Sequence, residues 1–477
     1  MPDTHTNRPG PSEAALEIQG LIKRSRAAQA QIANYTQEQV DALIRAVVWS
    51  TSRPGMAEKI AKHAVEETQL GNYDGKYMKI FRKARAALFD IINDKSVGVI
   101  EEDKARNIIK IAKPVGVIGA LSPSTNPEGT PVIKSISAIK GRNSIIIAPH
   151  PRAKLTNKMI VDLMRGALVD YGAPADLIIG IETPSVEKTE ELMRQCDRVL
   201  ATGGSAMVKA AYSSGTPALG VGVGNAVITV DDTADLKDAA TKIRLSKTVD
   251  LAASCSADNA NVYFESVYDE MVKLLEAEGG YLVSPEEKKK LQAAMFVDGH
   301  LNTAIVAQTA DKIAAMAGIK LPEGKTFIMV PETGYGPEYP FSGEKLSVVL
   351  TIYKVKNIDE AIALTNNIQA YQGSGHSCGI YSKNQEHIMK LAHATKTSRV
   401  IVNQPQGLSN SGNLWNGMRQ TLSLGCGSWG GNATNNNVTW RDLINETWVA
   451  QPLAKNKELP SDEELFGDAI KRVKITN

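Results

Sequence analysis

Cys255 is the residue of this sequence whose surroundings best suit covalent chemistry. It lies in the short polar turn ASCSAD, directly before an apolar run, so its thiol could be exposed at the mouth of a strand. Cys196 lies in an amphipathic helix pattern, Cys378 in a strand pattern and Cys426 between glycines, which makes each a weaker candidate. The competing interpretation is that Cys255 is a small buried hydrophobe, as most lone cysteines are.

An exposed thiol could act on an aldehyde. Its attack forms a thiohemiacetal, and hydride transfer to a nicotinamide then leaves a thioester. The oxyanion needs a preorganised donor, and Asn126, in the turn STNPEG, could supply its side-chain amide. A turn-forming asparagine before Pro127 would look the same. His376, which follows the glycine-rich turn of QGSGHSCG, could move the proton, or it could be a structural histidine.

A glycine-rich turn at the end of one predicted strand suits a dinucleotide. In parallel α/β sheets, ligands bind beyond the carboxyl ends of the strands. The turn after RVLA consists of Thr202, Gly203, Gly204 and Ser205. Glycine lets backbone amides approach a pyrophosphate, and the N-terminus of the following helix favours its charge. A tight connection without a ligand needs the same residues, so both interpretations stay open.

Two further turns could contact the ribose of a dinucleotide. His150 and Arg152, in IIIAPHPRAK, follow another predicted strand, where they could bind the ribose or its phosphate or face solvent. Glu344, in SGEKLSVVL, opens a strand and could accept hydrogen bonds from ribose hydroxyls, or it could be a solvated glutamate. These turns leave the choice between NAD and NADP open.

Apolar runs alternate with amphipathic stretches from Ile108 onward, which is typical of parallel βαβ units and predicts an α/β fold. We expect one doubly wound sheet from about Ile108 to Val230. The earlier residues read mostly as helix, and Thr36 to Gln39 match a capping box. The predicted divisions are a disordered tail at 1–12, a dinucleotide-binding domain at 13–246, a catalytic domain with the thiol nucleophile at 247–430, and a C-terminal return and oligomerisation segment at 431–477.

The composition argues against several classes of protein. The 54 Lys and Arg against 52 Asp and Glu give a formal net charge of +2, which provides no field for nucleic acid or an anionic membrane. The four cysteines include no CxxC pair, so we expect neither a disulfide scaffold nor a zinc ribbon, and no metal. A reducing cytoplasm fits best, because the N-terminus also lacks the features of a signal peptide.

Two long segments are nearly free of charge. At 22% charged residues, a 41-residue window should hold about nine charges, yet Val400 to Trp440 contains only Arg419. The window from Val199 to Val230 contains only Lys209. Both are too rich in polar residues and backbone breakers to cross a bilayer. They are therefore predicted to be soluble segments with no use for charge.

Six sequence blocks together resemble the coenzyme A-acylating branch of the aldehyde dehydrogenase superfamily, over roughly Thr36 to Val449. In the family's order they are PSTNPEGTPVIKSISAIKGRNSIIIAPHPRAK, LATGGSAMVKAAYSSGTPALGVGVGN, the Cys255 turn, the Glu344 strand, GSGHSCGIYS and TLSLGCGSWGGN. The resemblance implies a Rossmann-type dinucleotide-binding domain, a second α/β catalytic domain and a small oligomerisation arm. It also implies NAD or NADP as cofactor, coenzyme A as co-substrate, and a homodimer or homotetramer.

The resemblance assigns roles to residues already singled out. Cys255 would be the nucleophile, and the side chain of Asn126 with the backbone amide of Cys255 would form the oxyanion hole. His376 is added as a further catalytic candidate. The residues expected to line the dinucleotide site are Ser122, Pro149, His150, Arg152, Thr202, Gly203, Gly204, Ser205, Gly222 and Glu344.

One departure from the hydrolytic branch of the superfamily predicts the acyl acceptor. Hydrolytic members carry a glutamate in the glycine-rich strand upstream of the cysteine, where it activates water. Here that strand reads PALGVGVGNAV, and no acidic residue lies between Asp197 and Asp231. Without this base water attacks the thioester slowly, so the thiol of coenzyme A can accept the acyl group.

The blocks PSTNPEGTP, AIKGRN and IVNQPQ are most similar to members that act on anionic short aldehydes, namely succinate semialdehyde and sulfoacetaldehyde. Arg419 could hold a sulfonate or carboxylate through paired hydrogen bonds, with Ser124 and Asn413 as neutral donors. The alternative for Arg419 is a structural ion pair with a distant carboxylate.

We therefore expect a dehydrogenase that interconverts sulfoacetaldehyde plus coenzyme A with sulfoacetyl-CoA, using NAD or NADP. One alternative keeps this chemistry but takes succinate semialdehyde or a short uncharged aldehyde such as acetaldehyde or propanal. The other is a binding protein that retains the fold without catalysis.

Overall fold

The N-terminal segment is helical because its apolar residues recur at helical spacing. The computed structural model describes residues 10–473. Residues 1–9 of the tail predicted at 1–12 therefore lie outside the described residues. Helix α2 (Gln37–Ser52) begins at the expected capping box between Thr36 and Gln39. The other helices of the segment are α1 (Glu13–Gln31), α3 (Met56–Thr68), α4 (Tyr73–Tyr77), the π-helix η1 (Met78–Lys83) and α5 (Ala84–Ile91).

A five-stranded parallel sheet follows, in the order β5-β4-β3-β6-β7. Its strands are β3 (Val117–Ser122), β4 (Ser144–Pro149), β5 (Ile178–Gly180), β6 (Arg198–Thr202) and β7 (Ala218–Val221). The connecting helices are α6 (Thr130–Lys140), α7 (Lys154–Asp170), α8 (Val186–Gln195) and α9 (Ser205–Ser213). Strands β3 and β4 are buried along their whole length, which explains their unbroken apolar runs. The strand order reverses direction between β3 and β6, where ligands bind in folds of this kind.

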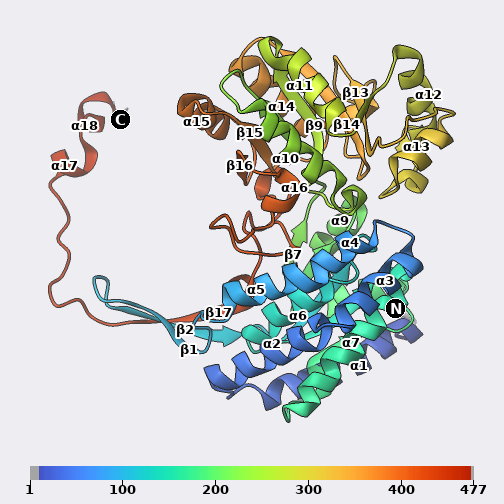
Figure 1. Ribbon diagram of the computed structural model, residues 1–477. Helices are drawn as coiled ribbons and strands as arrows, with labels where there is room; N and C mark the ends of the chain where they lie inside the picture. The colour runs from blue at the N-terminus through green and yellow to red at the C-terminus, as the bar shows by residue number, and fades with distance from the viewer. Residues whose placement is uncertain (1–9, 474–477) are drawn as a thin grey trace, which may run out of the picture.

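A second, seven-stranded parallel sheet has the order β10-β13-β14-β9-β8-β15-β16. Its strands are β8 (Ala226–Val230), β9 (Asp258–Phe264), β10 (Gly280–Leu282), β13 (Phe327–Pro331), β14 (Val349–Val355), β15 (Cys378–Tyr381) and β16 (Val400–Val402). The helices of this lobe are α10 (Leu236–Thr248), α11 (Glu265–Ala277), α12 (Pro285–Met295), α13 (Ala310–Met316), α14 (Ile358–Tyr371), α15 (Gln385–Ala394) and α16 (Gln406–Ser409), with a small hairpin of β11 (Phe296–Val297) and β12 (His300–Leu301). Figure 1 shows the two lobes stacked, with the first sheet and the N-terminal helices below.

The prediction of a single sheet from Ile108 to Val230 is wrong at both ends. Strand β2 (Ile108–Pro114) pairs with β1 (Gly98–Asp103) and β17 (Ile444–Ala450), and β8 pairs with β9 and β15 of the second sheet. Helix α10 packs against α11, so it also belongs to the second lobe. The predicted boundary between residues 246 and 247 therefore falls too late. The chain crosses between the sheets in the glycine-rich segment that joins β7 to β8.

A three-stranded antiparallel arm extends from the lower lobe (Figure 1). It is formed by β1 (Gly98–Asp103), β2 and β17 (Ile444–Ala450), and the chain continues into α17 (Asp462–Phe466) and α18 (Ala469–Arg472). After Ile444 every residue of β17 is exposed. An arm of this kind suits the predicted oligomerisation segment at 431–477, whose role stays a prediction.

Among residues 10–473, no helix is both long enough and apolar enough to cross a bilayer.

The close packing of α8 on the centre of the first sheet can be tested at Gly119. A Cβ there would lie 2.7 Å from Cys196 Sγ and 3.2 Å from Leu192 Cγ. We expect Gly119→Ala to lower the free energy of unfolding by about 1–3 kcal/mol, because an overpacked core must shift. The measurement is the urea midpoint followed by circular dichroism.

Gly20 in α1 is the matched control. A Cβ at this position would have no atom within 4 Å, so Gly20→Ala should leave stability unchanged or raise it by about 0.5–1 kcal/mol through helix propensity. Equal losses in the two variants would contradict the packing argument.

Candidate active site

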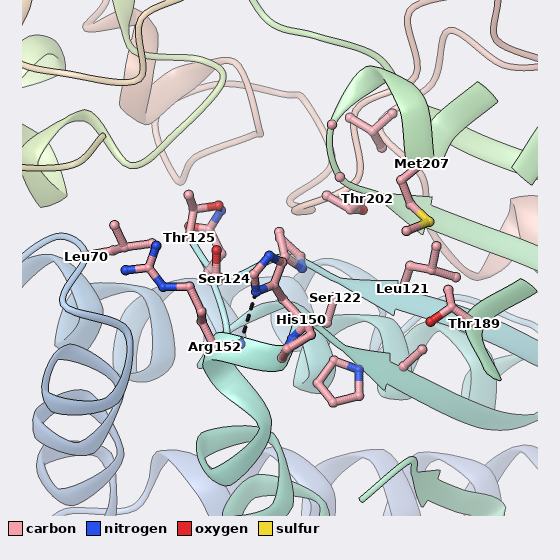
Figure 2. A pocket seen from close by; sticks show the side chains of 18 of the residues that line it. Leu70, Leu121, Ser122, Ser124, Thr125, His150, Arg152, Thr189, Thr202 and Met207 are labelled. Carbon is pink, nitrogen blue, oxygen red and sulfur yellow. Dashed lines mark hydrogen bonds between the residues drawn. The ribbon is translucent and has the colours of Figure 1, made fainter. Parts of the chain in front are cut away.

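A cavity of about 440 Å³ lies between the two lobes, at the carboxyl ends of the first sheet. Figure 2 shows His150 near its centre, with Thr202 and Met207 on one side and Arg152, Thr125 and Leu70 on the other. The cavity brings together most of the residues predicted from sequence to form the site. These are Ser122, Ser124, Asn126, Pro149, His150, Arg152, Thr202, Gly203, Gly204, Gly222, Cys255 and Glu344.

The thiol of Cys255 contacts the imidazole of His376. The distance from Sγ to Nε2 is 3.2 Å. Burial, followed by the charges of Glu344 and Cys426, raises the pKa of the Cys255 thiol to about 12. Burial and the nearby Arg399 guanidinium lower the pKa of His376 to about 3. The resting pair is therefore a neutral thiol beside a neutral imidazole.

The far side of the imidazole is oriented by a short hydrogen-bond chain. His376 Nδ1 lies 2.9 Å from Ser377 Oγ, which also accepts a hydrogen bond from Gln406 Nε2 at 3.0 Å. If Nδ1 donates to Ser377, Nε2 carries a lone pair that faces the thiol. In this tautomer His376 can accept the proton of Cys255.

Two amide groups beside the cavity are candidate donors to an oxyanion on the Cys255 adduct. Asn126 lines the same cavity as the thiol, and its Oδ1 accepts a hydrogen bond from Lys79 Nζ. That contact directs Nδ2 away from the lysine. The backbone amide of Cys255 makes no hydrogen bond within residues 10–473. Both amides are therefore free to donate to an oxyanion, and this role stays a prediction.

Gly224 allows the nucleophile turn to approach the first lobe. A Cβ at Gly224 would lie 2.1 Å from Cys255 O and 2.5 Å from Cys255 Cβ. No side chain fits there, so the crossing between the sheets must be glycine at this point. Gly224, in the crossing between β7 and β8, therefore allows the turn that carries Cys255 to pack closely against it.

The cavity walls fit a dinucleotide. Helix α9 begins at Ser205, and a Cβ at Gly204 would have no atom within 4 Å, so a phosphate can approach this backbone. Thr202 Oγ1 is buried without a hydrogen-bond partner among the described residues, although Thr202 lines the cavity. An unsatisfied hydroxyl in this position suits a polar ligand.

The basic turn after β4 lies at the edge of the same cavity. His150 Nδ1 accepts a hydrogen bond from the Arg152 amide, and the Arg152 guanidinium donates to Thr68 O at 3.0 Å. Both side chains are exposed residues of the lining. They line the part of the cavity where the ribose or its phosphate is predicted to bind.

Glu344 is the one carboxylate among the residues that line the cavity. Its Oε1 accepts a hydrogen bond from Gly224 N at 3.0 Å. Burial raises the pKa of Glu344 to about 8, so the side chain is mostly a neutral acid at pH 7. A neutral carboxyl can bind ribose hydroxyls but is a poor base for activating water.

Arg419 and Asn413 are not brought to the cavity. The Arg419 guanidinium forms an ion pair with Asp94 at 3.0 Å and donates to the Asp90 carbonyl. Asn413 is engaged within its own loop, where Nδ2 donates to Leu408 O at 3.0 Å. The prediction of substrate binding by these two residues is therefore wrong. The solitary charge had a partner more than three hundred positions away in the sequence.

A buried charged cluster behind the oxyanion donors was not predicted from the sequence. It consists of Lys76, Lys79, Glu128 and Asp250. The spacing of the two lysines in KYMKIFRK, three residues apart in an otherwise helical segment, places both on one face. That spacing was the available signal, although the same spacing is typical of a solvated helix face.

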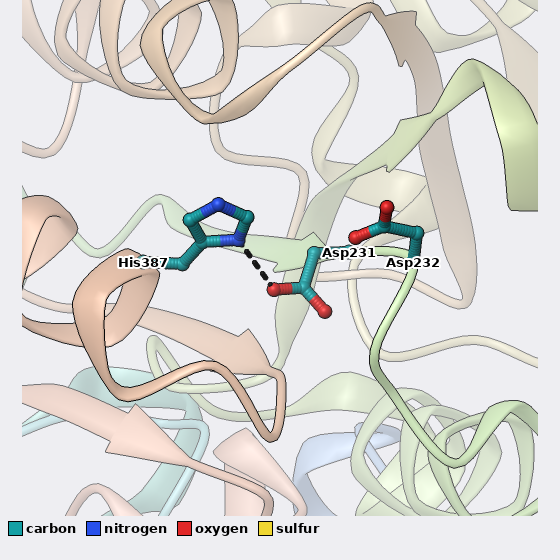
Figure 3. Close-up of side chains that lie close together, drawn as sticks. All are labelled: Asp231, Asp232 and His387. Atoms are coloured by element: carbon teal, nitrogen blue, oxygen red, sulfur yellow. Dashed lines mark hydrogen bonds and ion pairs between the residues drawn. The ribbon is translucent and has the colours of Figure 1, made fainter.

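Asp231, Asp232 and His387 are close enough to one another to be considered as metal ligands (Figure 3). Asp231 is already saturated, because it accepts hydrogen bonds from Thr233, Ser382 and His387. The cluster therefore ties the end of β8 to α15. The expectation that the protein uses no metal stays a prediction.

The sequence model of the aldehyde dehydrogenase family matches residues 11–328 and 340–439, and the chain belongs to this family. It is 47% identical over 462 residues to a sulfoacetaldehyde dehydrogenase of Acholeplasma sp, covering 96% of this chain and 95% of that protein. It is 41% identical over 467 residues to the acylating sulfoacetaldehyde dehydrogenase of Cupriavidus necator, covering 97% and 94%.

Solved structures agree with this family. An acetylating aldehyde dehydrogenase from Geobacillus thermoglucosidasius superposes with a TM-score of 0.90 at 34% identity, covering 95% of this chain and 100% of that chain. A propionaldehyde dehydrogenase from Rhodopseudomonas palustris, solved with bound CoA and an acylated cysteine, has a TM-score of 0.80 at 26% identity and covers 91% and 97%. The predicted α/β fold of the aldehyde dehydrogenase type is therefore confirmed.

The electrostatic link between Glu344 and Cys255 can be tested by alkylation. The pKa of Glu344 is raised from 4.5 to about 8, so its charge is absent at pH 6.5 and present at pH 9, where it opposes formation of the thiolate. We expect Glu344→Gln to speed iodoacetamide alkylation of Cys255 about three- to tenfold at pH 9.

At pH 6.5 the two proteins should react at similar rates, since Glu344 is then neutral. A Cys255→Ala protein corrects for the other cysteines. The same rate ratio at both pH values would contradict the link.

The structural role of Arg419 predicts a loss without selectivity. We expect Arg419→Ala to change kcat/KM equally for an anionic and an uncharged short aldehyde, within about twofold, and to cost about 0–1 kcal/mol of stability because the pair is partly exposed. Parallel kinetics on both substrates measure this. A loss confined to the anionic aldehyde would restore Arg419 as a substrate-binding residue.

Proposed function

We propose that this protein is a coenzyme A-acylating aldehyde dehydrogenase that interconverts sulfoacetaldehyde and coenzyme A with sulfoacetyl-CoA, using NAD or NADP. The observation that carries the chemistry is the 3.2 Å contact between Cys255 Sγ and His376 Nε2 beside a cavity that also holds Asn126. The anionic substrate is supported by the full-length similarity to two sulfoacetaldehyde dehydrogenases.

The acylation half begins with proton transfer from the thiol to His376. As the proton leaves, the sulfur forms a bond to the aldehyde carbon, and the carbonyl electron pair becomes an oxyanion held by Asn126 Nδ2 and the Cys255 amide. A nicotinamide bound in this cavity would supply the acceptor for the hydride of this thiohemiacetal. The carbonyl reforms, and the acyl group remains on Cys255 as a thioester.

The second half transfers the acyl group to coenzyme A. After His376 has released its first proton to solvent, the thiol of coenzyme A gives its proton to His376 and attacks the thioester carbon, and His376 passes this proton to the departing sulfur of Cys255. Water is disfavoured as the acceptor, because the segment from β7 to β8 contains no acidic residue and Glu344 is mostly neutral at pH 7. The absence of a base therefore favours thiol transfer over hydrolysis.

The residues of the cavity have separate roles in this scheme. The Gly203–Gly204 turn and the N-terminus of α9 would hold the pyrophosphate, and Glu344 the ribose next to the nicotinamide. Ser124 lines the cavity and supplies a neutral donor to the substrate. Coenzyme A would enter the same cavity, because its thiol must reach Cys255.

The assembly and location of the enzyme follow the family resemblance. A homodimer or homotetramer built through the β1-β2-β17 arm would cover the exposed face of β17. We place the enzyme in the cytoplasm, where its four free cysteines would stay reduced.

The reaction predicts a strict need for Cys255. With sulfoacetaldehyde, coenzyme A and NAD or NADP, the wild type should form NAD(P)H, and Cys255→Ala should lose activity by at least about a thousandfold because no thioester can form. Dinucleotide binding, measured by calorimetry, should be nearly unchanged. A panel with succinate semialdehyde, propanal and acetaldehyde ranks the substrates by kcat/KM.

Turnover by Cys255→Ala would remove the nucleophile assignment. A preference for succinate semialdehyde or an uncharged aldehyde would keep the chemistry and change the substrate. Inactivity of the wild type on every aldehyde would favour a binding protein with this fold.

A further inference from the structure

Lys79 connects both halves of the oxyanion hole. Its ammonium donates to Asn126 Oδ1 at 2.5 Å and to Ala253 O at 3.1 Å, and it also pairs with the Asp250 carboxylate. Asn126 supplies the side-chain donor, and Ala253 lies two residues before the Cys255 amide, which is the backbone donor. One side chain from the π-helix η1 therefore contacts the supports of both donors.

The contact with Asn126 determines which way its amide faces. An ammonium has three protons and no lone pair, so the atom that meets it must be the amide oxygen. Asn126 Nδ2 then faces away from Lys79, and it donates a hydrogen bond to Thr125 Oγ1 at 3.3 Å. Without the ammonium, the two orientations of the amide would be closer in energy, and in one of them the oxygen would face the oxyanion.

The ammonium is held at this place at a cost in solvation. Lys79 is 7% exposed, and burial lowers its pKa, while the charge of Asp250 opposes the shift. Its three protons have three acceptors, in Asn126, Asp250 and Ala253. A buried cation with every proton engaged is a rigid element, and a rigid element can position its neighbours.

Resting on the function proposed above, we propose that Lys79 is the positioning residue of the oxyanion hole. It orients the Asn126 amide and fixes its position relative to the backbone amide of Cys255, so that both donors point at one oxygen. Lys79 is not among the residues that line the cavity. Its effect therefore passes through Asn126 and the Cys255 turn.

A double-mutant cycle between Lys79→Met and Asn126→Ala tests this role. The readout is the single-turnover rate of NAD(P)H formation without coenzyme A, which reports acylation of Cys255 alone. We expect Asn126→Ala to slow this step about 100- to 1000-fold, and Lys79→Met about 10- to 100-fold. The double variant should be no slower than Asn126→Ala within about threefold, because Lys79 has no amide left to orient.

Lys76→Met is the matched control. Lys76 is also buried and also pairs with Asp250, but it donates to the Thr125 carbonyl and not to Asn126. The fold-decrease in acylation rate caused by Lys76→Met should multiply with the fold-decrease caused by Asn126→Ala in the double variant. Lys79→Gln is the conservative variant, since its amide can still donate to Asn126 Oδ1; it should react about three- to tenfold faster than Lys79→Met.

The outcomes separate positioning from general stability. Dinucleotide affinity that is unchanged in Lys79→Met, with a slower acylation step, supports the proposal. If the rate decreases caused by Lys79→Met and Asn126→Ala multiply in the double variant, the proposal is overturned. Equal acylation rates for Lys79→Met and Lys79→Gln would also overturn it. If Lys79→Met does not fold, the same cycle with Lys79→Gln decides. A wild type that forms no NAD(P)H with any aldehyde would refute the proposed function instead.

Discussion

The active site depends on a turn whose backbone is unfavourable by itself. Asp250, Leu251 and Ala252 all have left-handed conformations, with φ of 48°, 52° and 59°. For residues with a Cβ such conformations cost roughly 1–3 kcal/mol each. The turn leads directly to Cys255, so its shape sets the position of the nucleophile. Something outside the turn must hold it.

The support is the buried carboxylate of Asp250. It accepts a hydrogen bond from Asn72 N and pairs with Lys76 and Lys79. Gly71 and Gly75 make room for it, because a Cβ at either position would lie under 2.5 Å from an Asp250 atom. The helical segment before the first sheet is thus shaped around a residue of the second lobe. Buried ion pairs contribute little net stability, so the network is better understood as fixing one conformation.

Each of the two charge-poor segments contacts the turn that carries Cys255. Gly224 of the first segment contacts Cys255, and Asn410 of the second donates to Ser256 Oγ at 3.0 Å. Glu344 shows what a carboxylate does there, since its charge raises the pKa of the Cys255 thiol further. A second buried carboxylate would make the thiol still harder to ionise. The lack of charge in these segments therefore suits a neutral thiol that must lose its proton during attack.

Local patterns predicted the fold better than the site. Helix α2 begins at the predicted capping box, because caps and amphipathic spacing act within a few residues. The pairing of β8 with the second sheet and of Arg419 with Asp94 depends on segments far apart in the sequence. The turns at strand ends met in one cavity because parallel strands align their carboxyl ends. The roles of the lysines behind them depend on tertiary contacts that no local pattern contains.

The protonation state of His376 also bears on the acyl acceptor. A base with a pKa of about 3 is weak, so the acidity of the group it deprotonates matters strongly. A thiol has a pKa near 8.5 and bulk water has one of 15.7, a difference of about 7 units or roughly 10 kcal/mol. Thiols are also far better nucleophiles toward a thioester at a given basicity. A base this weak therefore favours a thiol over water as the acyl acceptor.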